Sequence, residues 1–163
     1  AYFITICTHN RQHFFGECTR GTMKLSTMGA IVQGFWYEIP KFSPHVELGA
    51  FVVMPDHLHG ILILTDRPND PVGPRQCHGP TRQCHGPTDK PNPNFYSRIT
   101  PNPGSISTII GSYKSACTKH IRRAFPETDF RWQERFYDHI IRNEKSFHRI
   151  SRYIINNPKN WDV

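Results

Sequence analysis

Two histidines one residue apart are the most informative feature of the sequence. His57 and His59 open residues 57–64, a stretch that is predicted to be a strand and that ends in a run of aliphatic residues. Side chains alternate between the two faces of a strand, so both imidazoles should point the same way. Two such imidazoles can hold one metal ion, but two polar residues that merely begin a strand are the ordinary alternative. The spacing alone leaves both interpretations open.

A second group of candidate residues lies near the C-terminus, in a stretch that is predicted to be helical over residues 144–157. Its apolar stripe consists of Phe147, Ile150 and Ile154. Arg149, Tyr153 and Asn157 follow one another at intervals of four residues and therefore share a different face. A guanidinium, a phenol and an amide could serve as phosphate contact, nucleophile and metal ligand. The residues alone equally allow a tyrosine at the edge of the core beside a solvated arginine.

The elements that must position these groups follow the order β-α-β-β-α-β, with one further helix. Strands are predicted over residues 2–8, 45–54, 57–64 and 136–141, and residues 61–64 are expected to be buried on both faces. Residues 9–24 are polar and rich in turn residues, and Pro55-Asp56 is predicted to be a tight turn. Helices are predicted over residues 25–39, 105–124 and 144–157, and Pro40 and Pro44 are expected to stop the first of them. Asn143 is the predicted N-cap of the last helix, and Pro158 is expected to end it. This order predicts the α+β class and a ferredoxin-like antiparallel sheet with helices on one face, plus an additional C-terminal helix that carries Tyr153.

A proline-rich segment interrupts this order over residues 65–103. It holds nine of the 14 prolines, and it repeats residues 75–81 without change as residues 82–88. We expect an insertion without regular structure in a single domain that spans residues 1–163. The repeat contains four residues of types that bind zinc: Cys77, His78, Cys84 and His85. A duplication in a tolerant loop is the favoured interpretation over a zinc site.

Composition and charge narrow the class of partner. The formal charge is +7 and the sequence pI is about 9.4, which favours an anionic partner. Residues 113–163 carry 11 Lys or Arg against 6 Asp or Glu, so the partner is expected there. Five arginines in this part could follow phosphates: Arg122, Arg123, Arg131, Arg135 and Arg142. No apolar run approaches 18 residues, which predicts no membrane span.

The five cysteines are an odd number in a chain with no recognisable secretory signal. Reduced thiols in the bacterial cytoplasm are therefore the expected state. Cys7 and Cys117 lie in apolar contexts and are predicted to be core residues.

Three blocks of sequence together resemble a known family. Residues 52–61 (VVMPDHLHGI) resemble the His-hydrophobic-His strand of the single-tyrosine transposases, which belong to the HUH endonuclease superfamily. Residues 132–143 (WQERFYDHIIRN), followed by residues 153–158 (YIINNP), resemble in particular the REP-associated tyrosine transposases. Residues 3–6 and 10–11 are similar to the first strand and turn of that branch. The blocks follow the family's order and spacing and cover most of the chain outside the proline-rich segment.

The resemblance implies a site and an activity. His57 and His59 match the paired histidine ligands, Tyr153 matches the nucleophile, and Asn157 matches the position of a third polar ligand. The implied enzyme is a metal-dependent endonuclease and strand transferase that acts in DNA transposition and recombination, with Mg²⁺ or Mn²⁺ as cofactor. It cuts single-stranded DNA at hairpin-flanked sites through a covalent 5′-phosphotyrosine. Members of the family are monomers or homodimers.

Two other functional classes remain possible on the residues alone. A non-catalytic nucleic-acid-binding module could use exposed aromatic side chains of a ferredoxin-like sheet, and it would not need paired histidines facing Tyr153. A metal-dependent hydrolase could activate water at His57 and His59, and it would leave no protein–DNA adduct. Tyr137, on the predicted fourth strand, is the main rival for the nucleophile.

Overall fold

The computed structural model describes residues 1–65 and 104–161. The predicted insertion lies outside the described residues except for Thr65, and so do the four repeated cysteine and histidine residues.

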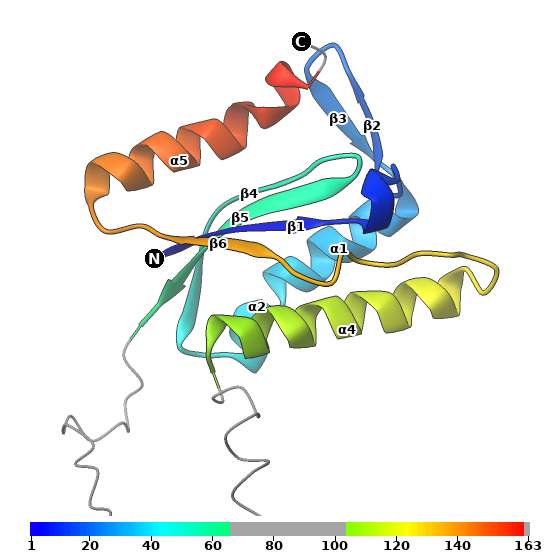
Figure 1. Ribbon diagram of the computed structural model, residues 1–163, viewed down its shortest axis with the longest axis horizontal. Helices are drawn as coiled ribbons and strands as arrows, with labels where there is room; N and C mark the ends of the chain where they lie inside the picture. Colours follow the sequence, from blue (N-terminus) through cyan, green and yellow to red (C-terminus); the bar gives the residue numbers. More distant parts are fainter. Residues whose placement is uncertain (66–103, 162–163) are drawn as a thin grey trace, which may run out of the picture.

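A four-stranded antiparallel sheet lies at the centre of the described chain (Figure 1). Its strands are β1 (Tyr2–Cys7), β4 (Val46–Val53), β5 (His57–Leu64) and β6 (Tyr137–Ile140). They are arranged in the order β4-β5-β1-β6, and each neighbouring pair is antiparallel. One helical stretch connects β1 to β4 and another precedes β6, so the ferredoxin-like prediction is confirmed.

Helices cover one face of the sheet where its aliphatic side chains are buried. They are α1 (Thr27–Tyr37), α2 (Ile39–Phe42) and α4 (Ile106–Ala124). The side chains of Ser26 and Ser105 cap α1 and α4 by accepting hydrogen bonds from backbone N–H groups of the first turn. The sheet residues buried in this layer are Ile4 and Ile6 of β1, Leu58 and Leu62 of β5, and Val46 and Val53 of β4. Strand alternation therefore sends the intervening residues of β1 and β5 to the opposite face.

Helix α5 (Glu144–Asn156) covers that opposite face, where it lies mainly over β4 and β5 (Figure 1). Asn143 caps it as predicted, accepting a 2.8 Å hydrogen bond from the backbone N–H of Ser146. Ile154 is completely buried against Ile61 and Ile141. The chain then turns into the short helix η2 (Asn157–Asn160). The additional C-terminal helix, α5, thus packs on the face of the sheet that carries His57 and His59, as the predicted site requires.

The structure differs from the predicted elements in one hairpin. Strands β2 (Gly16–Thr19) and β3 (Thr22–Leu25) pair within a region that the sequence predicts only as polar turns. Each strand has four residues, too few for an alternation that stands out from its polar surroundings. The short helix η1 (His9–Arg11) precedes the hairpin.

Two smaller differences have local causes. Pro40 lies in the first turn of α2 instead of ending a helix, because a first turn does not use the N–H that proline lacks. Ile63 and Leu64 are half-buried instead of buried on both faces, because β1 pairs with β5 only as far as Leu62.

No helix in residues 1–65 and 104–161 combines the length and apolar character of a membrane span.

Candidate active site

Strand β5 presents both candidate histidines on the face that α5 covers. Leu58, between them, is completely buried on the other face of the sheet. His57 and His59 are each 6% exposed, and their Nε2 atoms lie 3.1 Å apart. The structure therefore shows the same-face placement that strand alternation predicts.

His57 is oriented by its neighbour in the sequence. Its Nδ1 atom lies 2.5 Å from Oδ1 of Asp56, and Oδ2 of this buried carboxylate accepts from Nε of Arg11 at 3.0 Å. Burial alone would raise the pKa of Asp56, but its hydrogen bond and charge interaction with His57, and the charges of Arg11 and His13, hold the pKa below its ordinary value. The ionised carboxylate accepts a hydrogen bond from the Nδ1–H group of His57, so the lone pair of Nε2 faces His59.

His59 is oriented by strand β1. Its Nδ1 atom lies 2.8 Å from the hydroxyl oxygen of Thr5, the residue directly opposite in the antiparallel register. Burial, helped by the nearby His57 and Arg11, lowers the pKa of His59 to about 3. The imidazole is therefore neutral near pH 7, which is the form that binds metals.

Tyr153 reaches the histidines from α5, although it lies 94 residues from His59 in the sequence. Its hydroxyl is 3.5 Å from Nε2 of His59, and the two rings are 5.4 Å apart. The buried side chain of Ile154 anchors this turn of the helix, and Phe3 meets the tyrosine ring edge-on at 6.2 Å. Tyr153 is still 49% exposed, so a bulky substrate can reach the phenol.

Asn157 completes the set of predicted site residues. It is 8% exposed, at the junction of α5 and η2. It lines a cavity of about 380 Å³ together with both histidines and Tyr153. The remaining lining residues are Thr5, Arg11, Asn160 and Trp161. The structure thus brings the four predicted residues to one cavity.

Tyr137 occupies a different position on the same face. It lies opposite Thr5 on β6, its ring meets that of Phe3 at 6.3 Å, and it is not among the residues that line the histidine cavity. Of the two candidate phenols, the structure places that of Tyr153 beside the histidines.

Sequence reasoning overlooked three residues that hold the site together: Asp56, Thr5 and Arg11. Asp56 was interpreted only as part of a turn, although an acid directly before a His-x-His pair could have suggested a partner for the first imidazole. Thr5 and Arg11 lie in segments that resemble the family, but no local pattern indicates their contacts, because these depend on strand pairing and on the turn after β1.

Cys7 is not the core residue that was predicted. Because Ile4 and Ile6 are the buried residues of β1, Cys7 falls on the site face, opposite His57. Its sulfur accepts a hydrogen bond of 2.9 Å from Nη1 of Arg11. Cys117 is completely buried, as predicted, and burial raises the pKa of its thiol to about 12.

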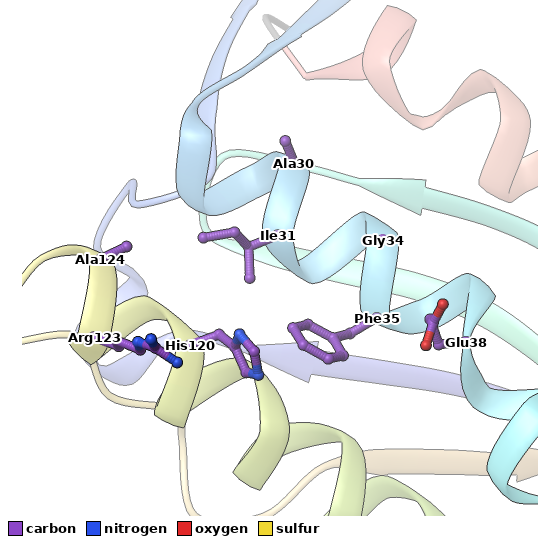
Figure 2. A pocket seen from close by; sticks show the side chains of 8 residues that line it. All are labelled: Ala30, Ile31, Gly34, Phe35, Glu38, His120, Arg123 and Ala124. Atoms are coloured by element: carbon purple, nitrogen blue, oxygen red, sulfur yellow. The ribbon is translucent and has the colours of Figure 1, made fainter.

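The five arginines proposed to follow phosphates do not gather in one place. Arg131 and Arg135 line a cavity of about 610 Å³ together with Arg11, which also lines the histidine cavity. Arg123 instead lies beside a groove of about 770 Å³ between α1 and α4, where Phe35 and His120 face each other (Figure 2). This groove is on the far side of the sheet from the histidines. Arg122 and Arg142 are exposed.

Comparison with known proteins sets this geometry in context. No family model matches the chain. An uncharacterized protein of Haemophilus influenzae is 35% identical over 164 residues, which span 99% of this chain and 81% of that protein.

Two solved structures are similar in fold. A REP-associated tyrosine transposase bound to a REP hairpin matches 98% of this chain and 67% of its own, with a TM-score of 0.55 and 19% identity. A candidate transposase from Deinococcus radiodurans R1 matches 95% of this chain and 88% of its own, with a TM-score of 0.51 and 16% identity. Identities this low establish a common fold and nothing finer. The chain therefore belongs to the family of the Haemophilus influenzae protein and has the fold of the two transposase structures.

Proposed function

We propose that residues 1–163 form one catalytic domain, a transposase-like endonuclease and strand transferase that acts on single-stranded DNA at hairpin-flanked sites. The observation that carries the proposal is the position of the Tyr153 hydroxyl, 3.5 Å from Nε2 of His59, beside two converging imidazoles. The fold shared with two transposase structures, one of them bound to a REP hairpin, supports DNA as the substrate.

The donor atoms fit a divalent cation. Two nitrogens that each lie about 2.1 Å from one ion, at a right angle, are about 3.0 Å apart. The 3.1 Å between the Nε2 atoms of His57 and His59 agrees with this arrangement, whereas two lone pairs facing each other without a cation or proton would repel. Asp56 supports the same role, because it keeps the proton of His57 on Nδ1.

Asn157 is the proposed third ligand. In residues 1–65 and 104–161, no group of three His, Cys, Asp or Glu side chains is arranged to hold an ion. Asn157 lines the same cavity as His57 and His59, and its amide oxygen is a suitable hard donor. Two imidazoles and one amide leave room for phosphate oxygens and suit Mg²⁺ or Mn²⁺. When bound, such an ion polarises the scissile phosphate and stabilises the departing oxygen.

Tyr153 supplies the nucleophile. A new bond joins its phenolic oxygen to phosphorus, and the bond from phosphorus to the 3′ oxygen breaks. The phenolic proton is released and the 3′ oxygen leaves as a hydroxyl, so the charge of the diester is unchanged. Solvent can take the proton because the side chain is 49% exposed. The 5′-phosphotyrosine retains the free energy of the diester bond, and a 3′ hydroxyl can reverse the step to join strands.

The surface beside Tyr153 suits a polyanionic strand. A cavity of about 850 Å³ along α5 is lined by Tyr153 together with three basic side chains: Lys145, Arg149 and Arg152. Lys and Arg side chains at such a surface can neutralise phosphates on either side of the attacked one. Arg149 therefore keeps the phosphate-contacting role expected from its place on the helix.

The test uses a labelled single-stranded hairpin DNA with Mn²⁺ and a denaturing gel that detects a covalent adduct. Tyr153→Phe should abolish the adduct and leave DNA binding nearly intact, because it removes one oxygen and keeps the ring that packs on Phe3. His57→Ala should also stop cleavage, but excess Mn²⁺ should partly restore it if His59 and Asn157 still hold the ion. Added metal cannot replace a missing nucleophile, so the two variants should differ in rescue.

Tyr137→Phe is the matched control and should form the adduct at the rate of the unaltered protein. An adduct that survives in Tyr153→Phe and disappears in Tyr137→Phe would assign the nucleophile to the other tyrosine. Cleavage that continues without an adduct would favour a hydrolase that activates water at the histidines.

A further inference from the structure

Part of the sheet face that carries the histidines is left without a covering helix. Helix α5 lies mainly over β4 and β5 (Figure 1). All four residues of β6 are exposed. In the antiparallel register, Tyr137 is opposite Thr5 and His139 is opposite Phe3. Directly opposed residues share a face, so Tyr137 points to the same side as the histidine cavity.

Three aromatic rings form a continuous row from the edge of the sheet to the site. The ring of Tyr137 meets that of Phe3 edge-on at 6.3 Å, and Phe3 meets Tyr153 edge-on at 6.2 Å. Phe3 also lies 5.3 Å from the ring of His59. Tyr137 is 59% exposed, so much of its ring is open to a ligand. The row therefore connects an exposed aromatic surface to the attacking phenol.

Positive charge borders this row. Arg135, two residues before Tyr137, lines a cavity with Arg11 and Arg131, and Arg11 also lines the histidine cavity. Glu134 is the one acidic residue among those that line this cavity. The segment that carries these residues is held to the end of β1, because the backbone N–H of Gln133 donates to the carbonyl of Cys7 at 2.9 Å. Exposed rings beside guanidinium groups are a combination that binds the bases and phosphates of a single strand.

From this arrangement we infer that Tyr137 is a stacking platform for a base of single-stranded DNA, near the phosphate that Tyr153 attacks. The inference rests on the proposed function and adds a binding role for a tyrosine that is not the nucleophile. Stacking uses the face of the ring and is tolerant of base identity, so Tyr137 should contribute affinity without strong sequence preference. Its hydroxyl should be dispensable.

The test measures binding without cleavage. Fluorescence anisotropy of a labelled single-stranded oligonucleotide is recorded in a Tyr153→Phe background, with no metal added. Adding Tyr137→Ala should weaken binding roughly 5- to 150-fold, as expected for the loss of one stacked base. Tyr137→Phe should stay within about twofold, because it keeps the aromatic face. Phe42→Ala is the control: Phe42 is 75% exposed, but it lies on α2 on the far side of the sheet, so binding should not change (Figure 1).

A second measurement locates the base. 2-Aminopurine, a fluorescent base, is placed at successive positions of the oligonucleotide. Its fluorescence should be quenched at one position when the Tyr153→Phe parent is bound. At that position the quenching should be relieved when the bound protein also carries Tyr137→Ala. Quenching that does not depend on residue 137 would overturn the proposal.

Any one of three results would overturn the stacking role of Tyr137. The first is equal affinity of Tyr137→Ala and its parent for the oligonucleotide, and the second is an equal loss of affinity in Tyr137→Ala and Tyr137→Phe. The third is the absence of any binding of single-stranded DNA. If circular dichroism shows that the alanine variant is unfolded, Tyr137→Leu replaces it, and unchanged affinity of this variant would equally overturn the proposal. The adduct assay on the unaltered protein tests the proposed function separately. If Tyr137→Ala weakens binding but the unaltered protein forms no adduct, only the stacking role is supported. If the unaltered protein forms the adduct but Tyr137→Ala leaves binding unchanged, only the transferase activity is supported.

Discussion

Replacing Asp56 by asparagine should weaken metal binding and leave the fold in place. Asp56 Oδ1 lies 2.5 Å from Nδ1 of His57, and Arg11 donates to its other oxygen at 3.0 Å. An ionised carboxylate only accepts hydrogen bonds, so the proton of His57 must stay on Nδ1. An amide of the same shape can also donate, and His57 could then carry its proton on Nε2, where it blocks ligation.

The expected loss of metal affinity follows from the burial of the contact between Asp56 and His57. Losing the hydrogen-bond partner of a ligating histidine typically costs about 10- to 100-fold in metal affinity, or about 1.4–2.7 kcal/mol. Asp56 is only 4% exposed, and buried hydrogen bonds to a charged group are worth about 1.5–3 kcal/mol, so we expect the upper half of that range. The shape of the side chain is kept, so the main structural loss is the ion pair with Arg11, whose side chain is 58% exposed.

Isothermal titration of the metal-free protein with Mn²⁺ measures the affinity, and the rate of adduct formation against Mn²⁺ concentration measures its consequence. The apparent Kd should rise, and the rate at saturating Mn²⁺ should fall less than the affinity does. Glu144→Gln is the matched control, since it removes the carboxylate of an exposed pair with His148 at 3.4 Å and should leave the Kd unchanged. An Asp56→Asn protein that binds Mn²⁺ as tightly as the unaltered protein would refute the reasoning.

Two further predictions concern stability. Ile154→Ala should lower the free energy of unfolding by about 2–5 kcal/mol in urea titrations, because Ile154 is completely buried between α5 and the sheet. The control is Ile155→Ala, at a position that is 65% exposed, which should lower the free energy of unfolding by less than about 0.5 kcal/mol. Equal losses in the two variants would contradict this packing. The metal-free protein should lose stability as the pH falls below about 6.5, because the unfolded chain then protonates His59 while the folded protein, with the pKa of His59 at about 3, does not. This residue contributes at most about 1.4 kcal/mol per pH unit, and His59→Asn should flatten the dependence measured by urea titration at several pH values. An unchanged slope would show that His59 is not buried as a neutral imidazole.

Most of the fold could be predicted from local patterns. The long helices and the strands of the main sheet carry several turns or alternations each, enough for their period to be visible. Asn143 was recognisable as a cap because capping depends on a side chain and the backbone three residues away. The hairpin of β2 and β3 was missed because two four-residue strands that depend on pairing with each other carry little local signal.

Part of the candidate site could also be predicted from local patterns, and part of it could not. The shared face of His57 and His59 could be predicted because it depends on the two-residue period of one strand. Cys7 was misplaced because an apolar neighbourhood in the sequence does not tell which face of β1 is buried; that depends on which side the helices α1 and α4 pack.

The sequence by itself determined most of the elements and their order, because these depend on local period. It also indicated the candidate site residues, through their side-chain chemistry and through the resemblance of three sequence blocks to a known family. The tertiary structure alone decided that the hydroxyl of Tyr153 stands 3.5 Å from His59, that Arg11 holds Asp56, and that Tyr137 lies outside the cavity. These contacts join segments that are far apart in the chain or depend on backbone turns. Their geometry comes from the packing of Ile154, a residue of α5, against the sheet and from the register of β1 between β5 and β6. No single stretch of sequence encodes either of these.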